Sequence, residues 1–242
     1  MEMKAQSIYG LFFEVQPKPG QRQAYFDYVD KLKPVLNLHE GLLWIQRYQS
    51  IDVPDLILSH QYWASEAALV AWRRNQEHRY SQTQGIKKIF ANYRIRVGPR
   101  IWSWSDENHS KEPPWDQNSF TKCILTLRKS RDKVVELDDA SVALNSRYVS
   151  LTSKYQELIT YACDSLTEAL LAKIFQSGAE RADLFLPERD YGLFDRSGAH
   201  LQILRVVCKQ QQTENYMKKD KKWAFVHHEE NHATWASGLR NI

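Results

Sequence analysis

The sequence predicts an α+β protein, with a ferredoxin-like β-α-β-β-α-β unit followed by a second, diverged α+β unit. Three observations support this prediction. The first hundred residues alternate strand-like apolar runs with two amphipathic helical segments. A polar stretch with Pro113-Pro114 then interrupts the pattern, and further strand-like and helical segments follow it. We therefore expect a domain at 1–104, a linker at 105–119, a second α+β domain at 120–208 and a helical tail at 209–242.

The elements of the first unit follow from local signals in order along the chain. The turn "QPKPG" separates an apolar strand from the first helix, and Ser65 is a plausible N-cap for the second helix. The expected elements are strands at 8–15, 42–48, 56–63 and 90–104, with helices beginning at Gln21 and Glu66. The 42–48 strand is apolar on both faces, so we expect the sheet to pack against a second sheet as well as against helices.

The second unit gives weaker signals. A strand is expected at 120–128, and helical spacing of apolar residues between Leu151 and Lys173 predicts a long helix or helix pair. Ser165 and Glu168 form a candidate capping box. The segment "ADLFLPERD" is typical of a strand, and the residues after it of a hairpin.

Composition narrows the class of protein. Hydrophobic residues make up 43% of the 242 residues and charged residues 26%, which is enough to bury a core. The formal net charge of +4 does not indicate a nucleic-acid partner, and no apolar run reaches the ~20 residues that span a bilayer. The three cysteines and the lack of a signal-peptide core at the N-terminus lead us to expect a cytoplasmic protein.

The stretch from Trp63 to Gly85 concentrates candidate functional residues. Trp72 and His78 are six positions apart, which places them about 120° apart on an unbroken helix. They face one pocket only if that pocket wraps the helix or if the helix bends near Asn75-Gln76, where asparagine competes with the backbone. The alternatives are that the tryptophans pack in the core and that His78 bonds to a backbone carbonyl.

The segments "VQPKPGQRQAYFDYV", "GLLWIQRYQS" and "YWASEAALVAWRRNQEHRYSQTQGIKKIFANYRIRV" together resemble the antibiotic biosynthesis monooxygenase family. That family includes small quinol and polyketide oxygenases. The resemblance covers roughly residues 7–104. It implies a dimeric α+β barrel with a pocket between each sheet and its helices, and hence a homodimer or an intrachain pseudo-dimer.

A chemical scheme follows for such a pocket. A phenol or quinol can reduce dioxygen once it is deprotonated, so the protein needs flat apolar walls, a base and shelter from water. His78 has an ordinary pKa suited to the base, and Arg94 can stabilise an oxyanion. The scheme needs no metal and no flavin. The expected substrate-binding residues are Phe13, Tyr62, Trp63, Trp72 and Tyr93.

The sequence therefore predicts a cofactor-independent monooxygenase that oxidises a small aromatic, quinol-like or polyketide-like substrate. Two alternatives stay open. One is a non-catalytic ligand-binding or assembly module. The other is a haem-binding or haem-degrading protein, although Phe13 and Gln82 depart from the asparagine and histidine of the haem enzymes that resemble this family. The pattern "HEENH" at 228–232 matches a zinc motif but lacks a third ligand after it.

Overall fold

A computed structural model describes residues 7–105 and 122–195. The expected linker, apart from Ser105, and the expected tail therefore lie outside the described residues, as does the hairpin beyond residue 195.

The first half has the predicted β-α-β-β-α-β order. Its elements are β1 (Tyr9–Pro17), α1 (Arg22–Asn37), β2 (Leu42–Ser50), β3 (Ile57–Trp63), α2 (Glu66–Arg74), α3 (Gln76–Gln84), the short π-helix η1 (Gly85–Ile89) and β4 (Phe90–Ser105). The strands lie in the order β2-β3-β1-β4, and all pairs are antiparallel. This order is the ferredoxin-like arrangement, so the predicted fold class is confirmed for this half.

The second half repeats this strand order with a single α-helix. Its elements are β5 (Cys123–Ser130), β6 (Val142–Ser150), β7 (Gln156–Cys163), α4 (Glu168–Gln176), β8 (Arg181–Phe185) and the short β9 (Arg189–Gly192). The order β6-β7-β5-β8 corresponds strand by strand to β2-β3-β1-β4. The residues between β5 and β6 form no helix, so α4 is the counterpart of α2 and the counterpart of α1 is missing.

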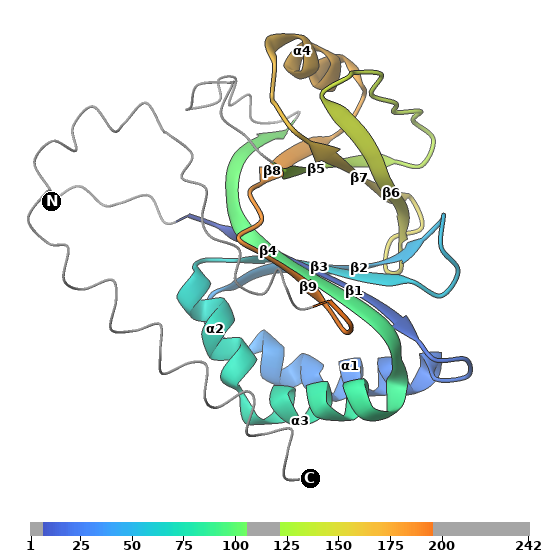
Figure 1. Cartoon of the computed structure of the whole chain (residues 1–242), viewed down its shortest axis with the longest axis vertical. Coiled ribbons are helices and arrows are strands. Elements are labelled where there is room, and N and C mark those ends of the chain that lie inside the picture. The colour runs from blue at the N-terminus through green and yellow to red at the C-terminus, as the bar shows by residue number, and fades with distance from the viewer. Residues whose placement is uncertain (1–6, 106–121, 196–242) are drawn as a thin grey trace, which may run out of the picture. The chain divides into compact units, whose positions relative to one another are not determined.

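The two sheets join edge to edge at both sides. Strand β2 pairs with β6 at one junction, and β4 pairs with β8 at the other. Eight strands therefore hydrogen-bond in a ring, β1-β3-β2-β6-β7-β5-β8-β4 and back to β1, which makes a barrel within one chain. In Figure 1 the helices α1, α2 and α3 lie below the first sheet, and α4 lies above the second.

The barrel interior is a core rich in aromatic residues. The buried members from both halves are Phe12, Tyr48, Leu58, Tyr62, Ile124, Tyr148, Leu158 and Phe185. Gly10 is required here, because a Cβ at this position would lie 2.4 Å from the ring of Phe185. The missing side chain leaves room for Phe185 of β8 to pack over β1 inside the barrel.

Separate cores fill the outer faces of the two sheets. Beneath α1 and α2 the first sheet buries two clusters, one around Trp63 and Trp72 and one around Val15 and Tyr25. α4 presents Leu170, Leu171 and Ile174 to the second sheet. Each sheet is thus buried on both faces, as the apolar pattern of β2 predicted. Among the described residues, every helix is too short or too polar to span a bilayer.

Two predictions for the second half were wrong, and one strand was missed. The segment predicted as one long helix or a pair holds strand β7 and only the short helix α4. The cap of α4 is Thr167, whose side chain accepts a hydrogen bond from the Leu170 N–H, and not Ser165. Strand β6 was not predicted at all.

Candidate functional site

The predicted site residues divide between two faces of the first sheet, because successive side chains of a strand point to opposite sides. On β3, Trp63 packs under the helices, whereas Tyr62 belongs to the barrel interior. On β4, Tyr93 packs in the core beside α1. Arg94 follows Tyr93 directly and so lies on the barrel side.

On the helix side, two tryptophans and two histidines form one aromatic group, called here the tryptophan–histidine cluster: His39, Trp63, Trp72 and His78. The rings of Trp63 and Trp72 are stacked with centroids 6.5 Å apart, and both tryptophans are buried. His39 follows α1 and lies 5.7 Å from Trp63 and 5.4 Å from Trp72, ring centre to ring centre. His78 stacks on Trp72 at 4.4 Å with only 17° between the ring planes.

A break at Asn75 brings His78 onto Trp72. Asn75 has ψ 132°, which ends α2 and lets α3 begin in a new direction. The Asn75 side chain then accepts a hydrogen bond from the His78 backbone N–H at 3.1 Å and so caps α3. The bend that the sequence required at Asn75-Gln76 is present, and the 120° offset of an unbroken helix no longer applies.

The hydrogen bonds of His78 define its proton state. Its Nδ1 lies 3.1 Å from the Trp72 carbonyl oxygen, which can only accept, so Nδ1 carries the proton and Nε2 carries a lone pair. Burial lowers the pKa of His78 to about 4, and the Trp72 carbonyl opposes this only in part. The half-buried imidazole is therefore neutral near pH 7, with Nε2 available as a hydrogen-bond acceptor.

Phe13 and Tyr93 lie on the same side of the sheet but in a different core. Phe13 pairs with Ser59 on β3, whereas Trp63 pairs with Tyr9, four residues away from Phe13 along β1. The Phe13 ring packs against Phe90 at 5.9 Å and against Tyr93 at 6.2 Å. The structure thus groups Trp63, Trp72 and His78, and places Phe13 and Tyr93 in the neighbouring cluster.

Tyr62 lies inside the barrel in a buried charge network. Its hydroxyl donates to Asp183 Oδ2 at 2.9 Å, and Arg181 and Arg100 also bind Asp183. Burial opposes ionisation of Asp183, but Arg181 and Arg100 hold the pKa of this carboxyl below its ordinary value. Tyr62 therefore links the two halves of the chain, and its side chain lies on the opposite side of the sheet from the tryptophan–histidine cluster.

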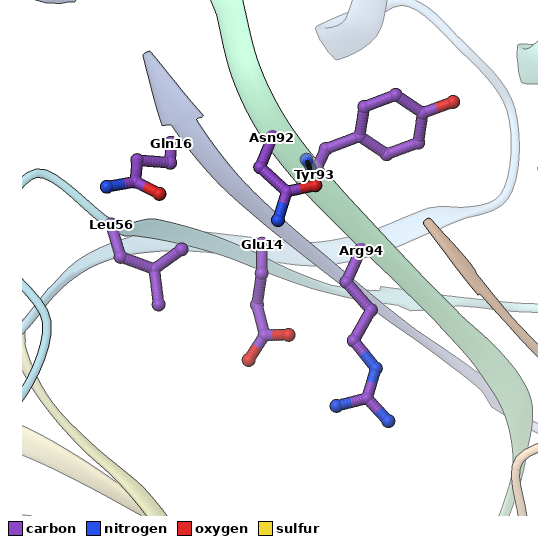
Figure 2. Close-up of a pocket in the computed structure, with 6 residues that line it drawn as sticks. All are labelled: Glu14, Gln16, Leu56, Asn92, Tyr93 and Arg94. Carbon is purple, nitrogen blue, oxygen red and sulfur yellow. Dashed lines mark hydrogen bonds between the residues drawn. The ribbon is translucent and has the colours of Figure 1, made fainter. Parts of the chain in front are cut away.

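Arg94 lines a pocket at one mouth of the barrel, here called the mouth pocket. Its volume is about 190 Å³, and its lining residues are Glu14, Gln16, Leu56, Asn92, Tyr93 and Arg94. Figure 2 shows the side chains of Glu14 and Arg94 extending in the same direction from neighbouring strands, while the Tyr93 ring points away. Arg94 donates from Nε and Nη2 to Asp190 at 2.8 and 2.7 Å. The two residues predicted to be catalytic, His78 and Arg94, thus lie on opposite sides of the sheet.

Sequence reasoning missed three residues that the structure singles out. His39 completes the tryptophan–histidine cluster, Glu14 lines the mouth pocket, and His60 is fully buried inside the barrel. Glu14 interrupts an apolar run in β1, and this was the available signal for it. His60 lies between Ser59 and Gln61 in β3, so its burial gave no clear signal. His39 follows a helix in a polar stretch and gave no signal of its own.

The described residues hold no group of three or more His, Cys, Asp or Glu side chains placed to bind a metal ion. The "HEENH" pattern at 228–232 lies outside them. The two described cysteines, Cys123 and Cys163, are buried and face each other across β5 and β7. Burial raises the pKa of both thiols to about 12, which makes them inert core residues.

Comparison with known families decides the nature of the first half, because residues 8–84 match the model of the antibiotic biosynthesis monooxygenase family. These residues form an antibiotic biosynthesis monooxygenase (ABM) domain. The match covers β1 to α3 and includes all four members of the tryptophan–histidine cluster. The predicted family is thereby confirmed for this part of the chain.

One curated relative of the ABM domain is the "Jasmonate monooxygenase ABM" of Pyricularia oryzae. It is 33% identical over 91 residues, which are 38% of this chain. The match spans 42% of the length of that relative.

Similar solved structures include a conserved protein from Methanosarcina mazei, at 16% identity and a TM-score of 0.36 over 38% of this chain and 92% of the other. A Pseudomonas aeruginosa protein is 17% identical, with a TM-score of 0.37 over 41% of this chain and all of the other.

Proposed function

We propose that this protein is a cofactor-independent monooxygenase and that its substrate, a small quinol-like or polyketide-like aromatic, binds at the tryptophan–histidine cluster. The observation that carries the proposal is the His78–Trp72 stack in the ABM domain, with Nδ1 tied to a carbonyl and Nε2 left as an acceptor. His39 and His78 are the partly exposed members of the cluster, and the buried rings of Trp63 and Trp72 form the apolar wall behind them, against which we propose that an aromatic substrate packs.

In this proposal His78 accepts a hydrogen bond from the substrate hydroxyl. A phenol with a pKa near ~10 does not give its proton freely to an imidazole with a pKa of about 4, since the gap corresponds to roughly 8 kcal/mol. His78 is therefore proposed first as the group that orients the hydroxyl and polarises its O–H bond. Full proton transfer occurs only as negative charge leaves the substrate for dioxygen.

The substrate itself supplies the electrons. At an activated methylene, one oxygen atom of O₂ enters as a carbonyl, and the two displaced hydrogens leave with the second oxygen atom as water. Such a reaction balances without an external reductant, which agrees with the expectation that no metal or flavin takes part. Arg94 has no role in this proposal, because it lies on the barrel side of the sheet.

The test measures oxygen consumption by the purified chain with a panel of quinols and aromatic polyketides, and with jasmonate, the compound named for the relative. We expect turnover of at least one quinol or polyketide and a ~10²–10⁴-fold loss in His78→Ala, the usual worth of a positioned proton acceptor. Arg79→Gln is the matched control, because Arg79 is an exposed neighbour on α3.

Three other results would count against the proposal. Turnover that is equal in folded His78→Ala would remove His78 from the reaction. A chain that consumes no oxygen with any compound would favour the non-catalytic binding module. A purified protein with a Soret band would favour the haem-binding alternative.

A further inference from the structure

We propose that the mouth pocket binds a small zwitterion of the free α-amino acid class, with its ammonium on Glu14 and its carboxylate on Arg94. This site lies on the barrel side of the sheet and is separate from the tryptophan–histidine cluster. It therefore does not depend on the proposed monooxygenase activity.

The first argument is an ion pair that does not form. Glu14 and Arg94 are direct cross-strand partners on β1 and β4, and opposite charges in this position ordinarily attract each other. Arg94 instead binds Asp190, and Glu14 Oε1 accepts from Arg96 Nη2 at 2.9 Å and from Tyr148 Oη at 2.7 Å. The two neighbouring charges are held apart by partners on either side.

This arrangement leaves one acceptor and one donor without a partner on side chains that line the pocket. Among the described residues, Glu14 Oε2 and Arg94 Nη1 have no hydrogen-bond partner. The Glu14 side chain is only 10% exposed, so its carboxylate is a built part of the pocket wall and not a solvated surface group. A ligand with a donor cation beside an acceptor anion would satisfy both atoms at once.

The charge balance argues against simple ions. A lone anion at Arg94 would also face the Glu14 carboxylate, and a lone cation at Glu14 would face the Arg94 guanidinium. Each simple ion would therefore be attracted by one charged side chain and repelled by the other. A zwitterion adds no net charge and aligns its own dipole with that of the pocket.

The volume of the mouth pocket and its other lining residues further restrict the class of ligand. At about 190 Å³ the pocket has the volume of roughly six water molecules, so it fits a small amino acid and not a polycyclic compound. Gln16 and Asn92 add side-chain amides. Asn92 Oδ1 accepts from the Tyr93 N–H at 2.8 Å, which leaves its amide N–H groups for a polar ligand side chain such as a hydroxyl.

The experiment is calorimetric titration of the full chain at pH 7 with serine and asparagine as probes. We expect saturable binding, and at least ~10-fold weaker binding of N-acetylserine, which lacks the ammonium, and of ethanolamine, which lacks the carboxylate. Arg94→Gln should weaken serine binding by at least ~10-fold. Arg147→Gln is the matched control, because Arg147 on β6 makes a similar two-nitrogen contact with Asp52 and does not line the mouth pocket, so this variant should leave binding unchanged.

Glu14→Gln removes the charge but keeps an oxygen acceptor for Arg96 and Tyr148, and it should also weaken binding. If this buried change prevents folding, Asn92→Leu on the pocket rim gives the second comparison. Failure of serine and asparagine to bind at ~10 mM would overturn the proposal. So would equal binding of N-acetylserine, or unchanged binding by folded Arg94→Gln. Because the readout is binding, these outcomes are independent of oxygen consumption.

Discussion

At the scale of single residues, Trp72 can serve packing, ligand binding or both. Its side chain is 4% exposed and stacks on His78 and Trp63. If it only packs, Trp72→Ala should cost ~3–5 kcal/mol of unfolding free energy, as other large core deletions do. We expect a smaller loss of stability together with a clear loss of substrate affinity, since we propose that the ring is also a binding surface.

Chemical denaturation and substrate titration of Trp72→Ala measure the two effects separately. Leu69→Ala in the same core cluster is the comparison, because it removes packing without removing an aromatic ring. Equal affinity of the two variants for substrate would mean that Trp72 is a packing residue alone.

His60 makes the stability of the barrel depend on pH. Burial lowers its pKa to about 4, its Nδ1 bonds to the Leu11 carbonyl, and no described residue partners its Nε2. The unfolded chain protonates this histidine near pH ~6.5 and the folded chain only near pH 4. The free energy of unfolding is therefore not reduced by His60 above pH ~6.5. As the pH falls from ~6.5 toward 4, protonation of this histidine in the unfolded chain lowers it by about 3 kcal/mol.

Unfolding free energies measured across this pH window test the point. His60→Leu should show a shallower decline from pH 6.5 to 4 than the unmodified chain. Leu125→Ala, in the separate core under α4, should lower stability by the same amount at every pH. A decline of unchanged steepness in His60→Leu would assign the pH dependence to other groups.

At the scale of elements, the interruption between α2 and α3 controls the environment of His78. We expect Asn75→Ala to favour a continuous helix, because it removes the cap on the His78 N–H. Residue 78 would then rotate about 120° away from Trp72. The pKa of His78 should rise from about 4 toward the ordinary ~6.5, as a proton NMR titration would show.

Ser65→Ala is the control for this experiment. Ser65 caps α2 by accepting from the Ala68 N–H, and its loss should cost a similar ~1 kcal/mol of stability. It should leave the pKa of His78 where it is. A His78 pKa that stays near 4 in Asn75→Ala would show that the break does not depend on this cap.

The same scale shows why the second half resisted prediction. The residues of β7 are buried on both faces of the sheet, with Leu158 toward the barrel and Ile159 toward α4. Such a strand is a continuous apolar run, which periodicity cannot distinguish from a buried helix. Strands β1 to β4 were predictable because turns with Pro, Gly and Asp separated them, and because the ABM resemblance reached that far.

The site was predictable in part for a similar reason. Sequence spacing indicated Trp72 and His78, and it also indicated that a bend near Asn75-Gln76 would bring their side chains together. Sequence spacing did not show that Tyr62 and Trp63 face opposite sides of the sheet, or that Arg94 faces the barrel. Which side a strand residue faces is known only once the strand bounds and their register are known. Glu14 belongs to the mouth pocket through a partner 80 positions away, and only the pairing of β1 with β4 reveals it.

At the scale of the whole molecule, the barrel uses strands from a single chain. Both edge junctions, β2–β6 and β4–β8, are made within the chain. A second subunit is therefore not needed to cover the first sheet. Of the two predicted arrangements, homodimer or intrachain pseudo-dimer, we expect the second to describe the protein in solution.

Light scattering on the eluting protein tests this expectation. A mass near 28.4 kDa at every concentration would agree with it. The unfolding midpoint should also be independent of protein concentration, unlike that of an obligate dimer. A stable mass of twice this value would show that another surface joins two barrels.

Because both halves belong to one chain, the residues at the two openings of the barrel can change independently. In a symmetric dimer every substitution is made twice, so both openings must change together. Here β1 and β5 run in opposite directions around the ring, and their last residues lie at opposite openings. One opening carries Glu14 across from Arg94, and the other carries Arg128 across from Arg181. Each end can thus evolve its own ligand through single substitutions that leave the other end untouched.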